Sequence, residues 1–409
     1  MSVIGIAGEY NPFHYGHLHH IKATKEQLGE DCPVVCVMSG DFIQRGEAAV
    51  YSKFARAEAA VRSGVDLVIE LPLPWTLSSA EGFARGTVGL LGASGVVTHM
   101  SFGSECGELA ELEALAELLL RPDLGTLIRG ELDADEGIPF ALARQRAAEK
   151  LIGAPARLLE APNNILAVEY IKQIYGQRLA IEPVTVRRIG AGHDGTAASG
   201  PRSASELRRA LAAGLTISGS VPPEAYEVYH REDEYGRGPV GQERLETAAL
   251  ARLRMLREQA FSELPDSGEG LSNRLMRAAK TEPTLDAVLA ASKSKRYALS
   301  RIRRMTMCAV LGVTARDALD TPPYIRVLAA NGRGCALLHD MNSRSRVPVI
   351  TKPASVRTLD GECRRIFALG SDAHDFFALG CTAREERRGG ADMRTSPVII
   401  RDDGIQFRK

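Results

Sequence analysis

The stretch that most constrains this fold is residues 3–20, with the sequence VIGIAGEYNPFHYGHLHH. Its first part, Val3 to Gly8, is an apolar run bounded by small residues, which predicts a buried strand at the start of the fold. The dipeptide Asn11-Pro12 then predicts a loop, because proline biases the residue before it away from the helical conformation. Apolar residues recur at helical spacing after this loop, so His14 and His17 are expected where the loop becomes a helix.

These two histidines are candidates for binding a phosphate. A helix N-terminus carries unpaired N–H groups and a partial positive charge, which suit an anion. His14 and His17 add imidazole donors, and Gly16 between them lets another group approach closely. Two other interpretations stay open: the histidines of this stretch decorate a surface helix, or some of them bind a metal ion. A metal site would need closer support from cysteine or carboxylate ligands than this stretch offers, so we predict no metal-ligating residues.

Strand and helix patterns alternate through the first half of the chain. Further strands are predicted at 33–38, 66–71, 95–102 and 181–189, and helices at 52–63, 79–91, 108–120, 139–152 and from Pro162 onward. This alternation predicts an α/β fold with a parallel sheet, which binds ligands at the carboxyl ends of its strands. The loop after the second strand, with Asp41, Gln44 and Arg45, either faces that edge or is plain solvent surface.

Three other positions at strand or helix ends are candidates, each with a structural alternative. Gly103 ends a strand, where glycine is also a good turn former. Asn163 and Asn164 open a helix, where an asparagine also serves as a cap. Arg188 lies at the carboxyl end of the strand predicted at 181–189, where its forked guanidinium suits phosphate.

A second anion cradle is predicted at residues 203–208, SASELR, at the mouth of a helix. The hydroxyl groups of Ser203 and Ser205 and the first-turn amides would bind the anion, with Arg208 one turn further along. A capping box formed by Ser203 and Glu206 is the structural alternative.

The second half of the chain has a different pattern. We expect a linker at 221–238, helices from 245 to 311, and short strands at 323–328 and 348–352 packed on those helices; the segment 385–396 is expected to be mobile. Between Ser272 and Arg304 the sequence contains nine basic residues and only two acidic ones. This run either forms a solvated helical face or binds RNA, with Tyr297 available to stack an unpaired base.

Composition excludes several other classes. Apolar residues make up 44% and charged residues 25% of 409 residues, which is typical of a soluble protein with two or three domains. No apolar run of about 18 residues and no secretory signal is apparent, and seven scattered cysteines favour reduced thiols, so a cytoplasmic location is expected. The formal net charge is zero, so any RNA site must be a local patch.

The motif His14-Tyr15-Gly16-His17 resembles the HxGH signature of the nucleotidylyltransferase superfamily. The longer string GEYNPFHYGH resembles the bacterial tRNA(Met) cytidine acetate ligases, and the similarity extends from Val3 to about Lys352. Residues 203–208 look like the ISSTxIR element of nucleotidylyltransferases, although Arg202 and the pair Ser205-Glu206 depart from it. Residues 292–297, SKSKRY, resemble the KTKRYTxxR segment of the ligases, and residues 39–47 are also similar to theirs.

This resemblance implies a Rossmann-like nucleotidylyltransferase sheet in residues 1–222 and a mainly helical RNA-binding domain in residues 223–409. It implies an ATP-dependent ligase that forms acetyl-adenylate, with Mg2+ shielding the phosphates, and acetylates N4 of the wobble cytidine of elongator tRNA(Met). The catalytic groups would be His14, His17 and Arg208. ATP would contact Ala7, Gly8, Glu9, Tyr10, Asn11, Pro12, Phe13, His14, Tyr15, Gly16, His17, Leu18, His19, His20, Gly103, Asn163 or Asn164, Arg188, Ile189, Ser203 and Ser205. Transfer RNA would contact Lys293, Lys295, Arg296, Arg301, Arg303 and Arg304.

Two other functions stay open at the level of sequence. An adenylyltransferase acting on a small phosphorylated metabolite would share both phosphate-binding motifs but would need no basic helical domain. A non-catalytic RNA-binding protein with a relic nucleotide fold would keep the basic segment. No general base for the cytidine amine is evident, and the oligomeric state and the selectivity for acetate do not follow from the sequence.

Overall fold

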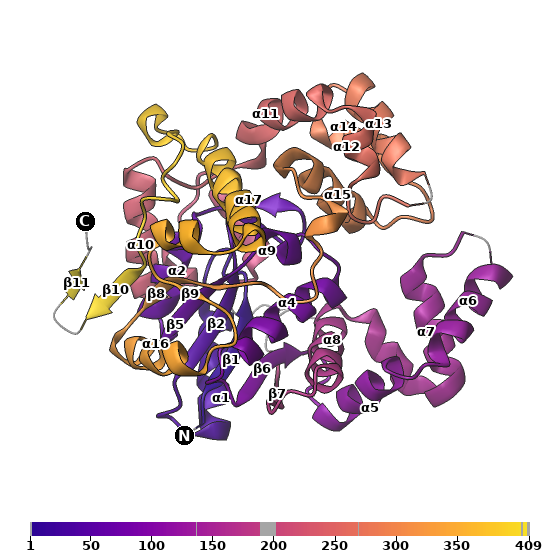
Figure 1. Cartoon of the computed structure of the whole chain (residues 1–409), viewed down its shortest axis with the longest axis horizontal. Coiled ribbons are helices and arrows are strands. Elements are labelled where there is room, and N and C mark those ends of the chain that lie inside the picture. Colours follow the sequence, from indigo (N-terminus) through magenta and orange to yellow (C-terminus); the bar gives the residue numbers. More distant parts are fainter. Residues whose placement is uncertain (1, 136, 189–201, 269, 402–403, 407–409) are drawn as a thin grey trace.

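A mainly parallel sheet lies at the centre of the molecule (Figure 1). The computed structural model describes residues 2–135, 137–188, 202–268, 270–401 and 404–406. Nine strands form the sheet in the order β11-β10-β8-β5-β2-β1-β6-β7, with β9 beside β8. The five strands from the first half of the chain are mutually parallel, as the sequence predicts: β1 (Ile4–Gly8), β2 (Val34–Ser39), β5 (Leu67–Leu71), β6 (His99–Ser104) and β7 (Glu182–Arg187).

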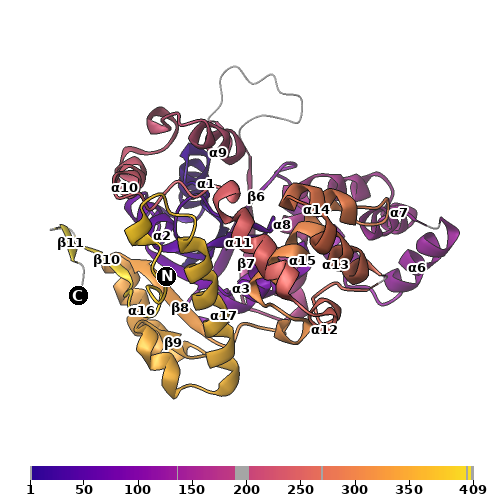
Figure 2. The same ribbon diagram turned by 90° about the horizontal axis from the view of Figure 1, so that it is seen from above.

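Helices cover both faces of this sheet, because its central strands are apolar on both sides. One face packs against α1 (Tyr15–Leu28), α2 (Lys53–Arg62), α9 (Ala204–Ala212) and α10 (Pro223–Glu234), which lie together in Figure 2. The other face packs against α4 (Ala80–Ala93), α5 (Leu109–Leu119) and α8 (Pro162–Gly176). Next to α5, α6 (Leu124–Ala134) and α7 (Phe140–Ile152) form a small cluster of their own.

The segment predicted as a linker, 221–238, instead contains α10. Ala225, Val228 and Tyr229 recur at helical spacing and are buried against α2. This apolar stripe is short and lies within a charged sequence, so its signal is weak in the sequence alone.

The strands predicted after residue 320 are present, but they join the central sheet, and the first of them packs on α2 and not on the helices predicted between 245 and 311. β8 (Ile325–Ala330) pairs antiparallel with β5, and β9 (Val349–Ile350) and β10 (Val398–Arg401) pair with β8. β11 (Gly404–Gln406) pairs antiparallel with β10, and α16 (Gly332–Arg344) and α17 (Gly361–Ala378) lie between these strands in the sequence. All six residues of β8 are buried, so it covers an edge of β5 that would otherwise expose unpaired backbone groups. Strands from the second half of the chain therefore complete the sheet formed by the first half. The domain boundary expected at residue 222 stays a prediction.

The helices predicted between 245 and 311 are confirmed. They are α11 (Gln242–Met255), α12 (Glu258–Ser262), α13 (Leu271–Thr281), α14 (Leu285–Ser292) and α15 (Leu299–Leu311). Their apolar faces form a separate cluster that also receives Phe377 of α17 and Leu77, which follows α3 (Leu73–Thr76). A hairpin of β3 (Phe42–Ile43) and β4 (Glu47–Ala48) reaches α15 from the sheet. Among the described residues no helix is long and apolar enough to cross a membrane, and all seven cysteines are free.

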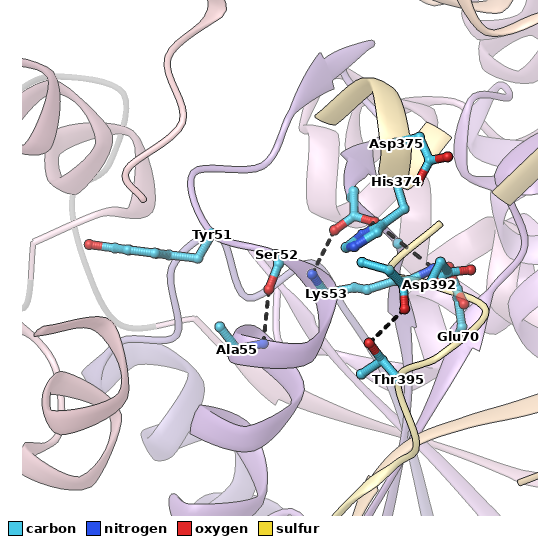
Figure 3. Close-up of polar contacts among 12 residues, drawn as sticks. Tyr51, Ser52, Lys53, Ala55, Glu70, His374, Asp375, Asp392 and Thr395 are labelled. Carbon is cyan, nitrogen blue, oxygen red and sulfur yellow. Dashed lines mark hydrogen bonds and ion pairs between the residues drawn. The ribbon is translucent and has the colours of Figure 1, made fainter. Parts of the chain in front are cut away.

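The expectation that 385–396 is mobile is wrong, because this segment contributes a buried side chain. Asp392 is fully buried and contacts Lys53 Nζ at 2.8 Å and Arg326 Nη1 at 2.7 Å. Glu70 also contacts Lys53, at 2.9 Å, so cations and carboxylates from four segments form one buried network (Figure 3). Because burying a charge without a partner is costly, this network fixes the C-terminal segment against the sheet.

Candidate active site

His14 and His17 are held by the helix they precede and join. His14 is the N-cap of α1, and its Nδ1 accepts a hydrogen bond from the Gly16 amide at 2.9 Å. His17 Nδ1 accepts from the His14 amide at 3.2 Å, so the two histidines form a reciprocal cap, with ring centroids 3.9 Å apart. A neutral imidazole whose Nδ1 accepts carries its proton on Nε2. Each ring therefore keeps one N–H donor that the helix does not use.

Both rings are neutral at pH 7. Burial, with the nearby guanidinium groups of Arg188 and Arg208, lowers the pKa of His14 to about 4. Burial also holds the pKa of His17 well below its usual value, and His14 and Arg188 add to this effect. Burial, Arg188 and His19 lower the pKa of His20 to about 4, and its Nε2 lies 2.9 Å from Ser101 Oγ. Neutral histidines could donate hydrogen bonds to an anion, but other groups would have to balance its charge.

The loop before His14 is fixed by Asn11 and by two residues that the sequence analysis did not identify, Tyr229 and Arg56. The hydroxyl of Tyr229 accepts from the Phe13 amide at 2.8 Å, and its ring stacks on Tyr51 with centroids 4.5 Å apart. Asn11 Oδ1 accepts from the Val50 amide at 2.8 Å. Arg56 is fully buried and donates to the backbone carbonyls of Glu9, Ser39, Gly40 and Tyr51. In the sequence, Arg56 is recognisable only as a charged residue within an alanine-rich helix.

The structure brings the second predicted cradle to this loop. Arg208 donates from Nη1 to the carbonyl of Asn11 at 3.0 Å and from Nη2 to Ser205 Oγ at 3.1 Å. Its charge also contributes to the low pKa of His14. The two motifs, which are almost 200 residues apart in the sequence, therefore form one site.

The capping box at the start of α9 is present. Ser203 Oγ accepts from the Glu206 amide at 3.3 Å, and the Glu206 carboxylate accepts from the Ser203 amide at 2.7 Å. The Ser205 hydroxyl is already bonded to Arg208. A phosphate at this helix mouth would have to displace the Glu206 carboxylate, so the binding roles of Ser203 and Ser205 stay predictions.

Gly103 leaves room for the side chain of Arg188. A Cβ at Gly103 would lie 3.1 Å from Arg188 Cγ, and the Arg188 amide donates to the Ser104 carbonyl at 3.0 Å. Arg188 follows β7, which is parallel to β6 and β1, so it lies at the same edge of the sheet as the start of α1, and its charge acts on the pKa of His14, His17 and His20. A Cβ at Gly8 would lie 2.9 Å from the ring of Tyr10, so packing within the protein accounts for this glycine. Ile189 lies outside the described residues.

Neither asparagine at the start of α8 acts as its N-cap. The N-cap is Ala161, and the carboxylate of Glu105 accepts from the amides of Asn163 at 3.1 Å and Asn164 at 2.7 Å. Asn164 is buried and its Oδ1 accepts from the Glu105 amide at 2.8 Å, which holds the turn after β6. The Asn163 amide group donates to Glu105 as well, at 2.6 Å. An acidic residue almost 60 positions earlier thus takes the capping role, which no local pattern could predict.

The loop 39–47 splits between two environments. The Gln44 amide donates to Glu9 Oε1 at 2.9 Å, so this part of the loop lies at the site. Asp41 does not face the site: it is buried, accepts from the Lys53 amide at 2.8 Å, and lies 2.8 Å from His374 Nδ1. His374, on α17, joins the buried network of Figure 3.

The basic segment is only partly available to a ligand. Lys293, Lys295 and Arg296 are exposed. Arg303 pairs with Glu47 at 3.0 Å, and Arg301 donates to the Asp266 carbonyl at 2.9 Å.

Tyr297 cannot stack a base as expected. It is 5% exposed, within the helical apolar cluster, with the Arg301 guanidinium 5.2 Å from its ring centroid. Burying this aromatic ring in the apolar cluster is more favourable than exposing it to water. The Nε of Arg304 is buried as well.

The chain is similar to known proteins in both sequence and structure. Residues 1–392 match the family model described as HIGH Nucleotidyl Transferase. A tRNA(Met) cytidine acetate ligase from Syntrophomonas wolfei is 34% identical over 97% of this chain and 99% of its own, and one from Acetivibrio thermocellus is 32% identical over 98% and 100%. The crystal structure of Thermotoga maritima TmcAL bound with alpha-thio ATP superposes with a TM-score of 0.91 at 32% identity, covering 98% of this chain and all of that one. The apo form of the same protein gives a TM-score of 0.92.

Proposed function

The chain belongs to the HIGH nucleotidyl transferase family and, within it, to the tRNA(Met) cytidine acetate ligases, and from this premise we propose what its site does. It binds ATP, activates acetate as acetyl-adenylate, and transfers the acetyl group to N4 of the wobble cytidine of elongator tRNA(Met). The observation that carries this proposal is the hydrogen bond from Arg208 to Asn11, because it joins both phosphate-binding motifs into one site.

The first step is displacement at the α-phosphorus. A carboxylate oxygen of acetate forms the new P–O bond, and the bond to pyrophosphate breaks with its electron pair leaving on pyrophosphate. We assign to His14 and His17 the donation of their Nε2 protons in hydrogen bonds to the oxygens that gain charge. Arg208, which contacts the histidine loop, would hold the departing phosphates, and Arg188, over Gly103, would lie near the adenosine. Such transfer depends on positioning and charge stabilisation more than on covalent help from the protein.

The second step uses the activated acyl group. The N4 amine of cytidine attacks the acetyl carbon, the bond from that carbon to the AMP oxygen breaks, and the amine proton is released. An adenylate is already an activated donor, so the proposal needs no dedicated base. The tRNA would be held by the exposed Lys293, Lys295 and Arg296.

Magnesium belongs to this proposal through ATP. The described residues include no group of three or more His, Cys, Asp or Glu side chains that could hold a metal ion. The ion would therefore be held by triphosphate oxygens and water, and it would shield phosphate charge when bound. A cytoplasmic location would follow from the tRNA substrate.

Pyrophosphate exchange tests the proposal against its rivals. Purified protein, ATP, Mg2+ and labelled pyrophosphate should give labelled ATP only when acetate is added, with no tRNA present. An adenylyltransferase would instead require a phosphorylated metabolite, and a non-catalytic RNA-binding protein would give no exchange. Either of those results would end the ligase proposal.

A further inference from the structure

The hairpin of β3 and β4 is fastened on both sides of its tip. On one side, the Gln44 amide donates to Glu9 Oε1 in the loop that follows β1. On the other side, Glu47 pairs with Arg303 of α15 at 3.0 Å, and a Cβ at Gly46 would lie 2.7 Å from the Arg303 backbone. Gly46 has a φ of +75°, so a side chain there would be strained as well as crowded. The residue between these anchors, Arg45, is therefore placed between the phosphate site and the helical segment.

The guanidinium of Arg45, next to the tip of this hairpin, is not paired with any other described residue. Its side chain is exposed, and within the described part of the chain it makes no hydrogen bond or ion pair. Its charge acts on two groups of the site, since it lowers the pKa of both Glu9 and Arg208. Glu47 also acts on Arg208, but its carboxylate is already paired with Arg303. The charges of Arg45, Arg208 and Arg56 thus all act on the half-buried carboxyl of Glu9, whose pKa is raised by the loss of solvent around it.

The charge balance of the site calls for such a group. A bound triphosphate carries several negative charges, and neutral His14 and His17 contribute hydrogen bonds without net charge. Arg188 lies over Gly103, at the other side of the histidine loop. The Arg208 guanidinium already donates hydrogen bonds to Asn11 and Ser205. Like-charged guanidinium groups brought close together are stabilised when an anion lies between them.

We propose that Arg45 binds the terminal phosphates of ATP opposite Arg208 and holds pyrophosphate as it leaves. This inference rests on the proposed function for the identity of the nucleotide. It adds to the two histidines and Arg208 a binding group from a segment between the two motifs. Because Glu47 holds the hairpin on α15, the position of Arg45 also depends on the helices that carry the predicted tRNA contacts.

Calorimetric titration of ATP and AMP separates this role from others, because AMP lacks the terminal phosphates. Arg45→Met should weaken ATP binding about tenfold or more and change AMP binding less than about twofold. Arg45→Lys, which keeps a point charge without the fork, should fall between. Glu47→Gln should weaken ATP binding by a smaller factor, since it only loosens the hairpin. The matched control is Arg346→Met, an exposed arginine beyond the opposite end of the sheet, beside Val3, and it should bind both nucleotides normally.

Unchanged ATP binding in Arg45→Met, or equal losses for ATP and AMP, would overturn the inference. A variant that binds ATP normally but fails only in tRNA acetylation would overturn it too, and would place Arg45 against the tRNA. The titrations need neither acetate nor tRNA. If acetate-dependent exchange failed in the unmodified protein while the difference between ATP and AMP held, the proposed function would be lost and the role of Arg45 would stand.

Discussion

Arg208 donates a hydrogen bond from its Nη1 to the backbone carbonyl of Asn11 across 3.0 Å. The two residues are 197 positions apart, and the contact joins the second turn of α9 to the loop that presents His14 and His17. The same guanidinium adds to the low pKa of His14. One candidate phosphate-binding site is thus assembled from two motifs that are each only moderately specific.

Replacing His17 by alanine should slow acetate-dependent pyrophosphate exchange about a hundredfold or more, because a donor to the developing phosphoryl charge is lost. The variant also loses the acceptor for the His14 amide, so it should be less stable by about 1 kcal/mol. Exchange kinetics and thermal unfolding separate these effects. Lys22→Ala, at an exposed position on the same helix, is the control. Full exchange in His17→Ala would refute the catalytic assignment.

Replacing Arg208 by lysine should raise the KM for ATP about tenfold and lower kcat, although the charge is kept. A lysine ammonium is a point charge and cannot bond to Asn11 and Ser205 with the geometry of the fork. The neighbouring exposed Arg209, changed to lysine, should leave both constants unchanged. Steady-state exchange kinetics measure both, and equal behaviour of the two variants would contradict the role given to Arg208.

The ligand-free protein should lose stability as the pH falls from about 6.5 to 4, partly through His14. The folded pKa of His14 is about 4 and the unfolded one about 6.5, so the unfolded state takes up the proton first. This pKa shift corresponds to a loss of about 3 kcal/mol in the free energy of unfolding at pH 4. His14→Gln should therefore flatten the pH dependence measured by urea unfolding. An unchanged slope would show that His14 titrates normally in the folded protein.

His374 should act in the opposite direction. Burial lowers its pKa, but the charge and hydrogen bond of Asp41 outweigh burial and raise it above the ordinary value. Its stabilising effect is therefore present below about pH 6.5 and is lost as the pH rises through the folded pKa. His374→Gln should cost more stability at pH 6 than at pH 9, in urea unfolding at both pH values. A cost that is the same at both would mean that the pair with Asp41 is not ionic.

Reversing the charges of Lys293, Lys295 and Arg296 together should raise the KM for tRNA about tenfold or more and reduce its salt dependence. Acetate-dependent pyrophosphate exchange without tRNA should not change, because these exposed side chains lie outside the ATP site. Reversal of the exposed Arg384, Arg388 and Arg394 is a control with the same change of charge. Equal losses in both triple variants would indicate a general charge effect in place of a binding surface.

The sequence predicted the parts of this molecule whose signals are local. Buried strands, the helix start at His14 and the helix mouth at Ser203 follow from periodicity and capping chemistry, and the structure contains them. The parts that were missed depend on partners far apart in the sequence. Arg56, Tyr229 and the Lys53–Asp392 pair act through residues that only the folded chain brings near. Tyr297 was misassigned because a ring beside basic residues gives the same sequence pattern whether it is exposed or buried in a core.

Mass spectrometry of nucleosides tests the proposed function most directly. Elongator tRNA(Met) lacking the modification is incubated with the purified protein, ATP, Mg2+ and carbon-13-labelled acetate, and is then digested to nucleosides. We expect one labelled N4-acetylcytidine per tRNA, located at the wobble position, and none with His17→Ala or without ATP. Unmodified tRNA from a reaction that contains folded, ATP-binding protein would contradict the assignment of this chain as a tRNA acetate ligase.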